Sequence, residues 1–349
     1  MMTTSDLHPL CDVVQHNCDI ADARHAANYT MCVYLLKMRE YYRWEKGYAY
    51  GEALPGKEVG QWVMHRESLW EDIEHESFNP LEIEGRKHDP FDTEEINRTL
   101  LPKGFVYSGG FGFGAVPHFF LAKLEEREDY EGYKVLVAAE ECARDLAAPP
   151  AMTLGKTIFI RRESLRRMLW EKVQEWQWHR YDNSMGRALQ FYPFDDDLEL
   201  ALDQITETET ETVILHEIGE VMANEYLGPE WREMVSSLPR SRTEMMARAV
   251  KDLLADALST LPGLIENQSH ASMHFYAANL LAMRKELYPS FFAHYQEWCD
   301  DHDDHGLKQL VAKSTQHWLA TAQLMLDHYR RHDVHRLKDL EQLIGQQRL

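Results

Sequence analysis

The residues best suited to chemistry lie in one short helical stretch, residues 212–226, with the sequence TVILHEIGEVMANEY. Most of its side chains are apolar, and three ionisable groups, His216, Glu217 and Glu220, stand among them. His216 and Glu220 are four residues apart and project from the same helical face, with Glu217 one step round the helix. Carboxylates in an apolar helix need a partner, because an unpaired buried charge costs several kcal/mol. A divalent cation is one such partner.

The pattern H-E-x-x-E differs at one position from the H-E-x-x-H helix of zinc metallopeptidases, in which two histidines hold the metal and the glutamate acts as base. The stretch VILHEIGE resembles the active-site helix of the gluzincin-type metallopeptidases, which is apolar before the histidine and has a glycine inside the motif. Those families take an acidic third ligand from a following helix, often in the pattern E-x-x-x-D. The next strong helical pattern, residues 243–261, carries Asp252 and Asp256 at that spacing.

This resemblance implies a metal-dependent hydrolase. His216, Glu220 and Asp252 would hold a divalent metal and leave a position for water, whose pKa the metal lowers. Glu217 would take a proton from that water as it attacks a carbonyl, and Asp256 would orient a ligand from outside the coordination sphere. Zinc is the favoured metal, and the harder donor set of one imidazole and two carboxylates also suits iron or manganese.

Three other interpretations use the same residues. In the first, the acids pair with arginines, such as Arg248 one turn from Asp252, and form a structural ion-pair cluster. In the second, the protein is a non-catalytic, metallopeptidase-like binding protein, in agreement with the missing second histidine. In the third, four helices converge as a di-iron or di-manganese oxidase inside a bundle; they carry the pairs Asp22 and His25, Glu217 and Glu220, Asp252 and Asp256, and His270 and His274.

The N-terminal part of the chain predicts helices and loops. Residues 12–46 predict one long helix with a stripe along one face, formed by Cys18, Asp22, His25, Tyr29 and Cys32. Such a stripe fits either half of a metal or substrate site or a buried packing face, and the frequent burial of free cysteine favours packing. Residues 47–104 are punctuated by glycine and proline and predict loops around one short helix, roughly residues 60–75.

The middle of the chain carries the signals of a sheet. Apolar runs at residues 118–124, 133–139 and 157–160 predict strands, and residues 188–194 are a further strand candidate. The glycine-rich segment at residues 105–118 lacks the G-K-[ST] of a phosphate-binding loop and predicts a hairpin or a flexible rim. A long helix is expected from Glu163, and everything after the LGPEW break is predicted to be helical.

These elements predict an α+β, mostly helical fold, with a small mixed sheet plus a helical C-terminal lobe, zincin-like in its order of elements. We expect residues 1–104 to form an N-terminal helical lobe with a loop-rich linker. Residues 105–349 would form the metal-binding domain, with the sheet in 105–211 and helices in 212–349.

Composition narrows the class of protein. The 349 residues include 37 basic and 58 acidic side chains and carry a net charge of −21, which argues against nucleic acid or an anionic membrane as the main partner. An apolar run of membrane-spanning length is absent from the sequence. Five cysteines at irregular spacing, with no recognisable secretory signal, predict reduced thiols and a cytoplasmic location. No motif specifies the substrate or the oligomeric state.

Overall fold

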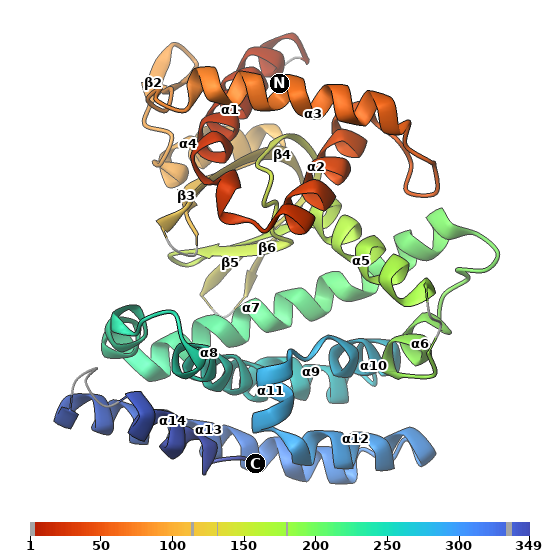
Figure 1. Ribbon diagram of the computed structural model, residues 1–349, viewed down its shortest axis with the longest axis vertical. Helices are drawn as coiled ribbons and strands as arrows, with labels where there is room; N and C mark the ends of the chain where they lie inside the picture. The colour runs from red at the N-terminus through yellow and green to blue at the C-terminus, as the bar shows by residue number, and fades with distance from the viewer. Residues whose placement is uncertain (1–3, 113–114, 131, 179–180, 333–336) are drawn as a thin grey trace. The chain divides into compact units, whose positions relative to one another are not determined.

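The computed structural model describes residues 4–112, 115–130, 132–178, 181–332 and 337–349. The chain divides into two compact units (Figure 1). The first unit contains Met1–Lys172 and Asp197–Thr206, and the second contains Val173–Asp196 and Glu207–Leu349. The first unit therefore holds both the N-terminal helices and the sheet.

Four α-helices belong to the first unit: α1 Thr4–His25, α2 Met31–Lys46, α3 Gly56–Ile73 and α4 Thr93–Leu100. The short helix expected near residues 60–75 is confirmed as α3. The single long helix expected over residues 12–46 is wrong, because the chain passes through a 3-10 turn at Ala26–Asn28 and then through extended Thr30. Asparagine and threonine favour caps and turns over helix interiors, which accounts for the break.

The N-terminal stripe is a packing face where it lies on α1. Cys18 is fully buried and its thiol donates to the carbonyl oxygen of Phe119, 3.2 Å away. The Asp22 carboxylate accepts a 2.8 Å hydrogen bond from the backbone N–H of Leu146. Cys32, beyond the break, is exposed. The packing interpretation is therefore confirmed for the α1 part of the stripe.

A curled five-stranded sheet forms the centre of the first unit, in the order β3-β4-β5-β7-β6. All neighbours are antiparallel except β5 and β7, so the sheet is mixed. Its strands are β3 Phe105–Phe111, β4 Pro117–Tyr130, β5 Tyr133–Arg144, β6 Ala151–Leu154 and β7 Thr157–Arg161. The three predicted strands in this region are confirmed. A separate two-stranded hairpin pairs β1 Leu81–Ile83 with β2 Arg86–His88.

Alternation along the strands creates two different apolar faces. One face presents Tyr107, Phe119 and Leu121 to Leu10 and Val14 of α1. The opposite face carries a second cluster, formed by Val106, Phe120, Ala122, Leu136, Ala138 and Phe159. Both clusters consist of residues that are at most 4% exposed, so the sheet is covered on both sides in these regions.

A buried ion pair joins β5 to β7. The Arg161 guanidinium donates to both carboxylate oxygens of Glu141, at 2.9 and 2.7 Å. The Ser164 hydroxyl donates to the same carboxylate at 2.7 Å, and the side chains of Arg161 and Glu141 are both 0% exposed. Burial alone would raise the pKa of Glu141, but the charge and hydrogen bonds of Arg161 lower it below its ordinary value.

Helices dominate the second unit. They are α6 Ser184–Leu189, most of α7 Leu198–Ser237, α8 Arg242–Ala255, α9 Leu261–Glu266, α10 His270–Asn279, α11 Ala282–Leu287, α12 Pro289–Asp301, α13 His305–His332 and α14 Leu337–Gly345. Helix α5, Arg162–Gln177, contains the chain division at residue 172, and α7 is interrupted at Gly228, where φ is +70°. A continuous apolar core spans α7 to α14 and includes Trp231, Leu253, Phe291 and Trp318.

The strand expected at residues 188–194 is wrong, since this segment contains the end of α6 and a following turn. Asn183 caps α6, because its side chain accepts a 3.0 Å hydrogen bond from the N–H of Gly186. An N-cap of this kind starts a helix irrespective of the aromatic residues that follow. The coarse prediction is confirmed: the fold is α+β and mostly helical, with a mixed sheet and a helical C-terminal part. Among the described residues, no helix is both long and apolar enough to cross a membrane.

Candidate functional site

The H-E-x-x-E residues lie where α7 meets the end of α8. A Cβ atom on Gly219 would be 2.3 Å from the carbonyl oxygen of Ala255, so only glycine permits this approach of the two backbones. Immediately after Ala255 the helix widens into one π-helical turn, η4 Asp256–Thr260. Such turns inside α-helices are frequent at functional sites. The glycine of the motif therefore has a direct role in bringing the two helices together.

His216 and Asp256 form the centre of the site. The Nδ1 atom of His216 lies 3.0 Å from Oδ1 of Asp256. The Asp256 side chain is only 1% exposed, whereas that of His216 is 34% exposed. Asp256 also accepts hydrogen bonds from the Thr260 and Tyr276 hydroxyls, at 3.2 and 2.8 Å, and from the Arg284 guanidinium at 2.9 Å. The carboxylate is thus fixed from several sides, and it fixes the imidazole in turn.

Charge in this cluster shifts the pKa values of both partners. Burial would lower the pKa of His216, but the hydrogen bond and charge of Asp256, together with the charges of Glu220 and Glu217, raise it to about 9. Burial would raise the pKa of Asp256, but the hydrogen bond and charge of His216 and the charge of Arg284 hold it below its ordinary value. At neutral pH this arrangement is an imidazolium–carboxylate pair.

The other two expected ligands have different surroundings. Glu220 is ion-paired with the ammonium group of Lys251. Asp252 follows Lys251 on α8, and within the described part of the chain it has neither a hydrogen bond nor an ion pair at the distances that define them. Burial raises the pKa of Asp252 to about 6, with Arg284 opposing that shift and Glu220 and Asp256 adding to it. Asp252 is therefore a carboxylate held among charges, with no bonded partner among the residues that the structure describes.

The structure brings some of the sequence-predicted residues together and leaves others apart. His216 and Asp256 are in direct contact, and Glu217 and Glu220 both act on the charge of His216. Among the described residues, no group of three His, Cys, Asp or Glu side chains is close enough to hold a metal ion in this arrangement. The donor types nevertheless suit a divalent cation, because Nε2 of His216 and the Asp252 carboxylate have no hydrogen-bond partner in the described residues.

The remaining candidate residues take part in separate contacts. The Nδ1 atom of His274 is 2.7 Å from the Tyr295 hydroxyl, and burial lowers the pKa of His274 to about 4. His270 stacks on His302 with 4.7 Å between ring centroids. On α1, His25 lies 3.5 Å from the side-chain amide of Asn28. Each contact is an ordinary packing or hydrogen-bonding role.

Sequence reasoning missed three residues of the site. Tyr276 and Arg284 bond to Asp256 from α10 and α11, and no spacing rule connects these positions to the motif. Glu209, also missed, is 2% exposed on α7 and accepts a 2.8 Å hydrogen bond from Ser272. Burial raises the pKa of Glu209 to about 7, although hydrogen bonds from Ser272 and Thr212 oppose the shift. Its position two turns before His216 was the available signal.

Comparison with known proteins gives a family without an assigned activity. No curated protein and no solved structure matches the chain. Residues 9–161 match the N-terminal domain, and residues 166–347 the C-terminal domain, of the family of unknown function DUF6866. The second match includes every residue of the α7–α8 cluster. The chain therefore belongs to the DUF6866 family.

Proposed function

We propose that the α7–α8 cluster is the centre of a metal-dependent hydrolase of metallopeptidase-like type, within a zincin-like domain. His216, Glu220 and Asp252 would hold one divalent cation, zinc in the first place and iron or manganese as alternatives. Glu217 is the base, and Asp256 orients His216 from outside the coordination sphere. The proposal rests on the motif and on the geometry around one imidazole.

The observation that carries the proposal is the contact between Asp256 and Nδ1 of His216. Metal-binding histidines usually donate their second ring N–H to a carboxylate, which fixes the tautomer and the ring orientation. Asp256 supplies that carboxylate and leaves Nε2 of His216, on a partly exposed side chain, for a ligand.

Lys251 would compete with the metal for Glu220. Its ammonium group pairs with Glu220, so a cation that binds Glu220 must displace it. The four-carbon lysine chain is flexible and strongly hydrated at its end, so displacement into solvent is feasible. Metal binding also requires a neutral His216, and must therefore release the proton that Asp256 stabilises. Metal affinity is consequently expected to rise with pH.

In the proposed hydrolysis the metal, Glu217 and Asp256 have different roles. A bound divalent cation would lower the pKa of a coordinated water. Glu217, next to His216 in the chain, accepts a proton from the attacking water and returns it to the leaving group. Asp256 keeps the imidazole oriented throughout, because it is itself held by Tyr276 and Arg284.

Metal content of the full-length protein, purified without chelator, tests the proposal. About one metal ion per chain is expected for the wild type, as three protein ligands define a single catalytic site. His216→Ala should lose that metal and the stability that it confers on the folded state. Glu217→Gln should keep the metal and lose turnover by on the order of 10²–10⁴ on any substrate that the wild type hydrolyses.

A matched control is His294→Ala in the same unit. The Nδ1 atom of His294 lies 2.9 Å from the carbonyl oxygen of Ser290, outside the cluster. This variant should retain full metal content. Equal metal content in wild type and His216→Ala would overturn the metal site on α7. A pair of iron ions, with Glu217→Gln reducing metal content, would instead identify the di-metal oxidase.

A second candidate function is a non-catalytic binding protein that uses the cluster for stability. It is favoured by the ion pairs of Glu220 with Lys251 and of Asp256 with Arg284, which already neutralise much of the negative charge. In this case neither the wild type nor the variants contain stoichiometric metal, and His216→Ala and Glu217→Gln act only on the melting temperature.

A further inference from the structure

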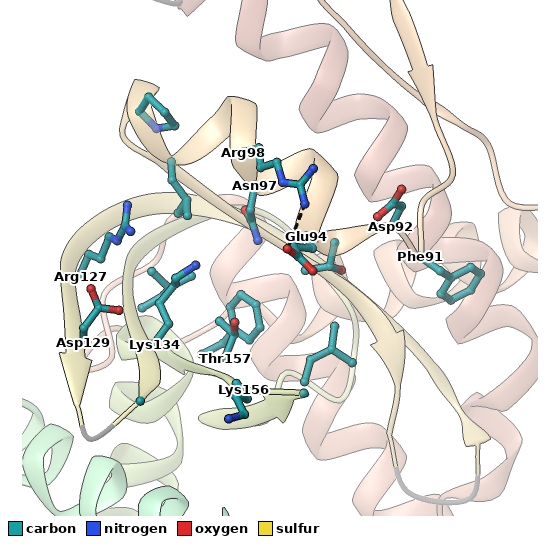
Figure 2. A pocket seen from close by; sticks show the side chains of 18 residues that line it. Phe91, Asp92, Glu94, Asn97, Arg98, Arg127, Asp129, Lys134, Lys156 and Thr157 are labelled. Atoms are coloured by element: carbon teal, nitrogen blue, oxygen red, sulfur yellow. Dashed lines mark hydrogen bonds and ion pairs between the residues drawn. The ribbon is translucent and has the colours of Figure 1, made fainter.

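A cavity of about 940 Å³ opens in the first unit, at one end of the curled sheet (Figure 2). It lies between helix α4 and the ends of β4, β5 and β7, and the 3-10 turn at Leu101–Lys103 also borders it. Its size falls in the range of small-molecule binding sites. The residues of the α7–α8 cluster do not line it, so it is a separate feature of the molecule.

Strand register gives this cavity an apolar floor. Arg127 of β4 lies opposite Leu136 of β5, which lies beside Phe159 of β7. Leu136 and Phe159 are each 1% exposed and belong to the apolar cluster of this sheet face. Leu154 at the end of β6 extends the apolar wall and is 37% exposed. An apolar part of a ligand would find contact here.

The next row toward the strand ends is polar. Asp129 of β4 lies opposite Lys134 of β5, which pairs with Thr157 of β7. All three line the cavity, and they share a sheet face with Leu136 and Phe159 because positions two apart point the same way. Figure 2 shows Arg127, Asp129 and Lys134 on the strands, facing the helix that carries Arg98. The rim is therefore charged where the floor is apolar.

Lys156 is fixed next to Lys134 by the backbone. It occupies the two-residue turn between β6 and β7, after Gly155, whose φ of +61° suits a tight hairpin. The backbone N–H of Lys134 donates a 2.9 Å hydrogen bond to the carbonyl oxygen of Lys156. The backbones of the two lysines are thus adjacent at the edge of the cavity, with Lys134 on β5 and Lys156 in the turn.

The acids that line the cavity do not neutralise this rim. Asp92 caps α4 by accepting from the N–H of Glu95, and Glu94 pairs with Arg98 at 3.1 Å. Across the described ranges of the chain, the cavity residues Arg127, Lys134 and Lys156 form no ion pair. The described residues that line the cavity include four cations, Arg98, Arg127, Lys134 and Lys156, and three carboxylates, Asp92, Glu94 and Asp129. The lining therefore carries a surplus of one positive charge, in a chain whose net charge is −21.

We infer that this cavity binds a small phosphomonoester with an apolar or aromatic body. A phosphomonoester carries a charge of about −1.5 to −2 at neutral pH, and the cavity offers three cations that have no ion pair in the described residues. Its three oxygens can accept from Arg127, Lys134 and Lys156 together, and charge-assisted hydrogen bonds of this kind are the strong ones. The apolar body then covers Leu154, the exposed apolar side chain beside the buried Leu136 and Phe159. A monocarboxylate has only two acceptor oxygens and would leave one of these three cations without one.

Calorimetric titration of the full-length protein with 1-naphthyl phosphate tests this inference, with 1-naphthoate and inorganic phosphate as comparison ligands. The wild type should bind 1-naphthyl phosphate more tightly than either. Lys134→Gln and Lys156→Gln should each weaken binding about tenfold, the effect of losing one charge-assisted hydrogen bond. Leu154→Ser should weaken binding of 1-naphthyl phosphate and leave inorganic phosphate unchanged.

Lys123→Gln is the matched control, because Lys123 lies on β4 outside the cavity and pairs with Glu140 on the surface. It should bind 1-naphthyl phosphate as the wild type does. Equal affinity for 1-naphthoate would overturn the phosphomonoester assignment in favour of a general anion site. Absence of saturable binding at millimolar ligand, or equal losses in Lys123→Gln and Lys134→Gln, would overturn the site itself.

Discussion

Two clusters of buried charge, one in each unit, differ in how completely their groups are bonded. In the first unit Arg161 and Glu141 form a two-pronged pair with Ser164 behind it, and neither side chain is exposed. In the second unit Asp256 is bonded from several sides, but its partner His216 is one-third exposed. Nearby, Asp252 is half-buried among charges without a hydrogen bond in the described residues.

This difference separates a structural ion pair from a candidate site. In the closed pair both carboxylate oxygens of Glu141 are bonded, and the pair tolerates burial because each charge is matched where it lies. Nη1 of Arg161 has no hydrogen-bond partner in the described residues, but it is sealed from solvent 3.8 Å from Asp145. The α7–α8 cluster keeps an imidazole nitrogen and a carboxylate available, and it perturbs the pKa of several groups at once. Clusters of perturbed ionisable groups are characteristic of functional sites.

The largest expected effect comes from breaking the closed pair. Glu141→Gln preserves shape but removes the carboxylate that bonds the buried Arg161 guanidinium, whose remaining acidic neighbour is Asp145 at 3.8 Å. We expect the free energy of unfolding to fall by about 3–5 kcal/mol, measured by urea unfolding. The neighbouring Glu140→Gln is the control, since Glu140 is 75% exposed and its pair with Lys123 contributes less than about 1 kcal/mol. Equal losses in the two variants would contradict the closed-pair interpretation.

A second prediction concerns Glu209, which shares α7 with the open cluster. Its folded-state pKa of about 7 exceeds the ordinary value of 4.5, so the folded protein holds a proton that the unfolded chain has lost. The unfolding free energy should therefore fall as pH rises from about 4.5 to 7, by about 3 kcal/mol in total.

Glu209→Gln isolates this contribution, because glutamine stays neutral at every pH. Unfolding free energies of the two proteins should be similar near pH 5. Near pH 8 the variant should be more stable than the wild type by nearly the full amount. A constant difference between them across this range would show that Glu209 titrates normally.

Removing a charge from the α7–α8 cluster should lower the free energy of unfolding less than removing Glu141 does. Asp256→Asn removes the charge that faces His216 and Arg284, and we expect a loss of about 2–3 kcal/mol, less than for a sealed pair because water reaches His216. NMR titration should show the pKa of His216 falling from about 9 toward its ordinary value. Asp252→Asn, one turn away, should change stability little or increase it when metal is chelated. A larger loss of stability in Asp252→Asn than in Asp256→Asn would contradict the description of Asp256 as the bonded carboxylate and Asp252 as the unbonded one.

The sequence predicted those features of the fold and of the candidate site that depend on neighbouring residues along the chain. The spacing of His216 and Glu220 predicted a helix, and the four-residue step from Asp252 to Asp256 placed a second carboxylate near the first helix, because helical periodicity is a local property. Arg284 and Lys251 could not be assigned their partners in this way. Their pairing with Asp256 and Glu220 follows from how separate helices pack.

The two errors in secondary structure have the same origin. Residues 188–194 contain aromatic and apolar side chains that suit a strand, but the cap at Asn183 starts a helix just before them. The break after His25 occurs although Ala26 and Ala27 are strong helix formers, and it is followed by Asn28 and extended Thr30. In both cases one or two residues at a helix boundary outweighed the average preference of a longer window. The cavity beside α4 was also missed, because only the pairing of β5 with β7 brings Lys134 next to the turn that carries Lys156.

The smallest expected change in stability is the most informative for the open cluster. The Lys251–Glu220 pair is partly exposed, so Lys251→Met should cost only about 1 kcal/mol. If Glu220 is a metal ligand, removing the competing ammonium should raise the affinity for zinc, by about tenfold for each 1.4 kcal/mol of competition removed. Lys251→Arg should restore the competition.

Zinc titration of these variants, followed by calorimetry, therefore distinguishes the two functions proposed for α7 and α8. Lys308→Met is the control, because Lys308 pairs with Asp304 at 3.7 Å in the same unit and away from the motif. If the cluster only stabilises the fold, Lys251→Met loses stability and gains no affinity for zinc, as Lys308→Met does. If the cluster is a metal site, Lys251→Met alone binds zinc more tightly, and adding His216→Ala abolishes that gain. The gain in zinc affinity requires that Glu220 and His216 bind the same cation, as the H-E-x-x-E spacing predicts.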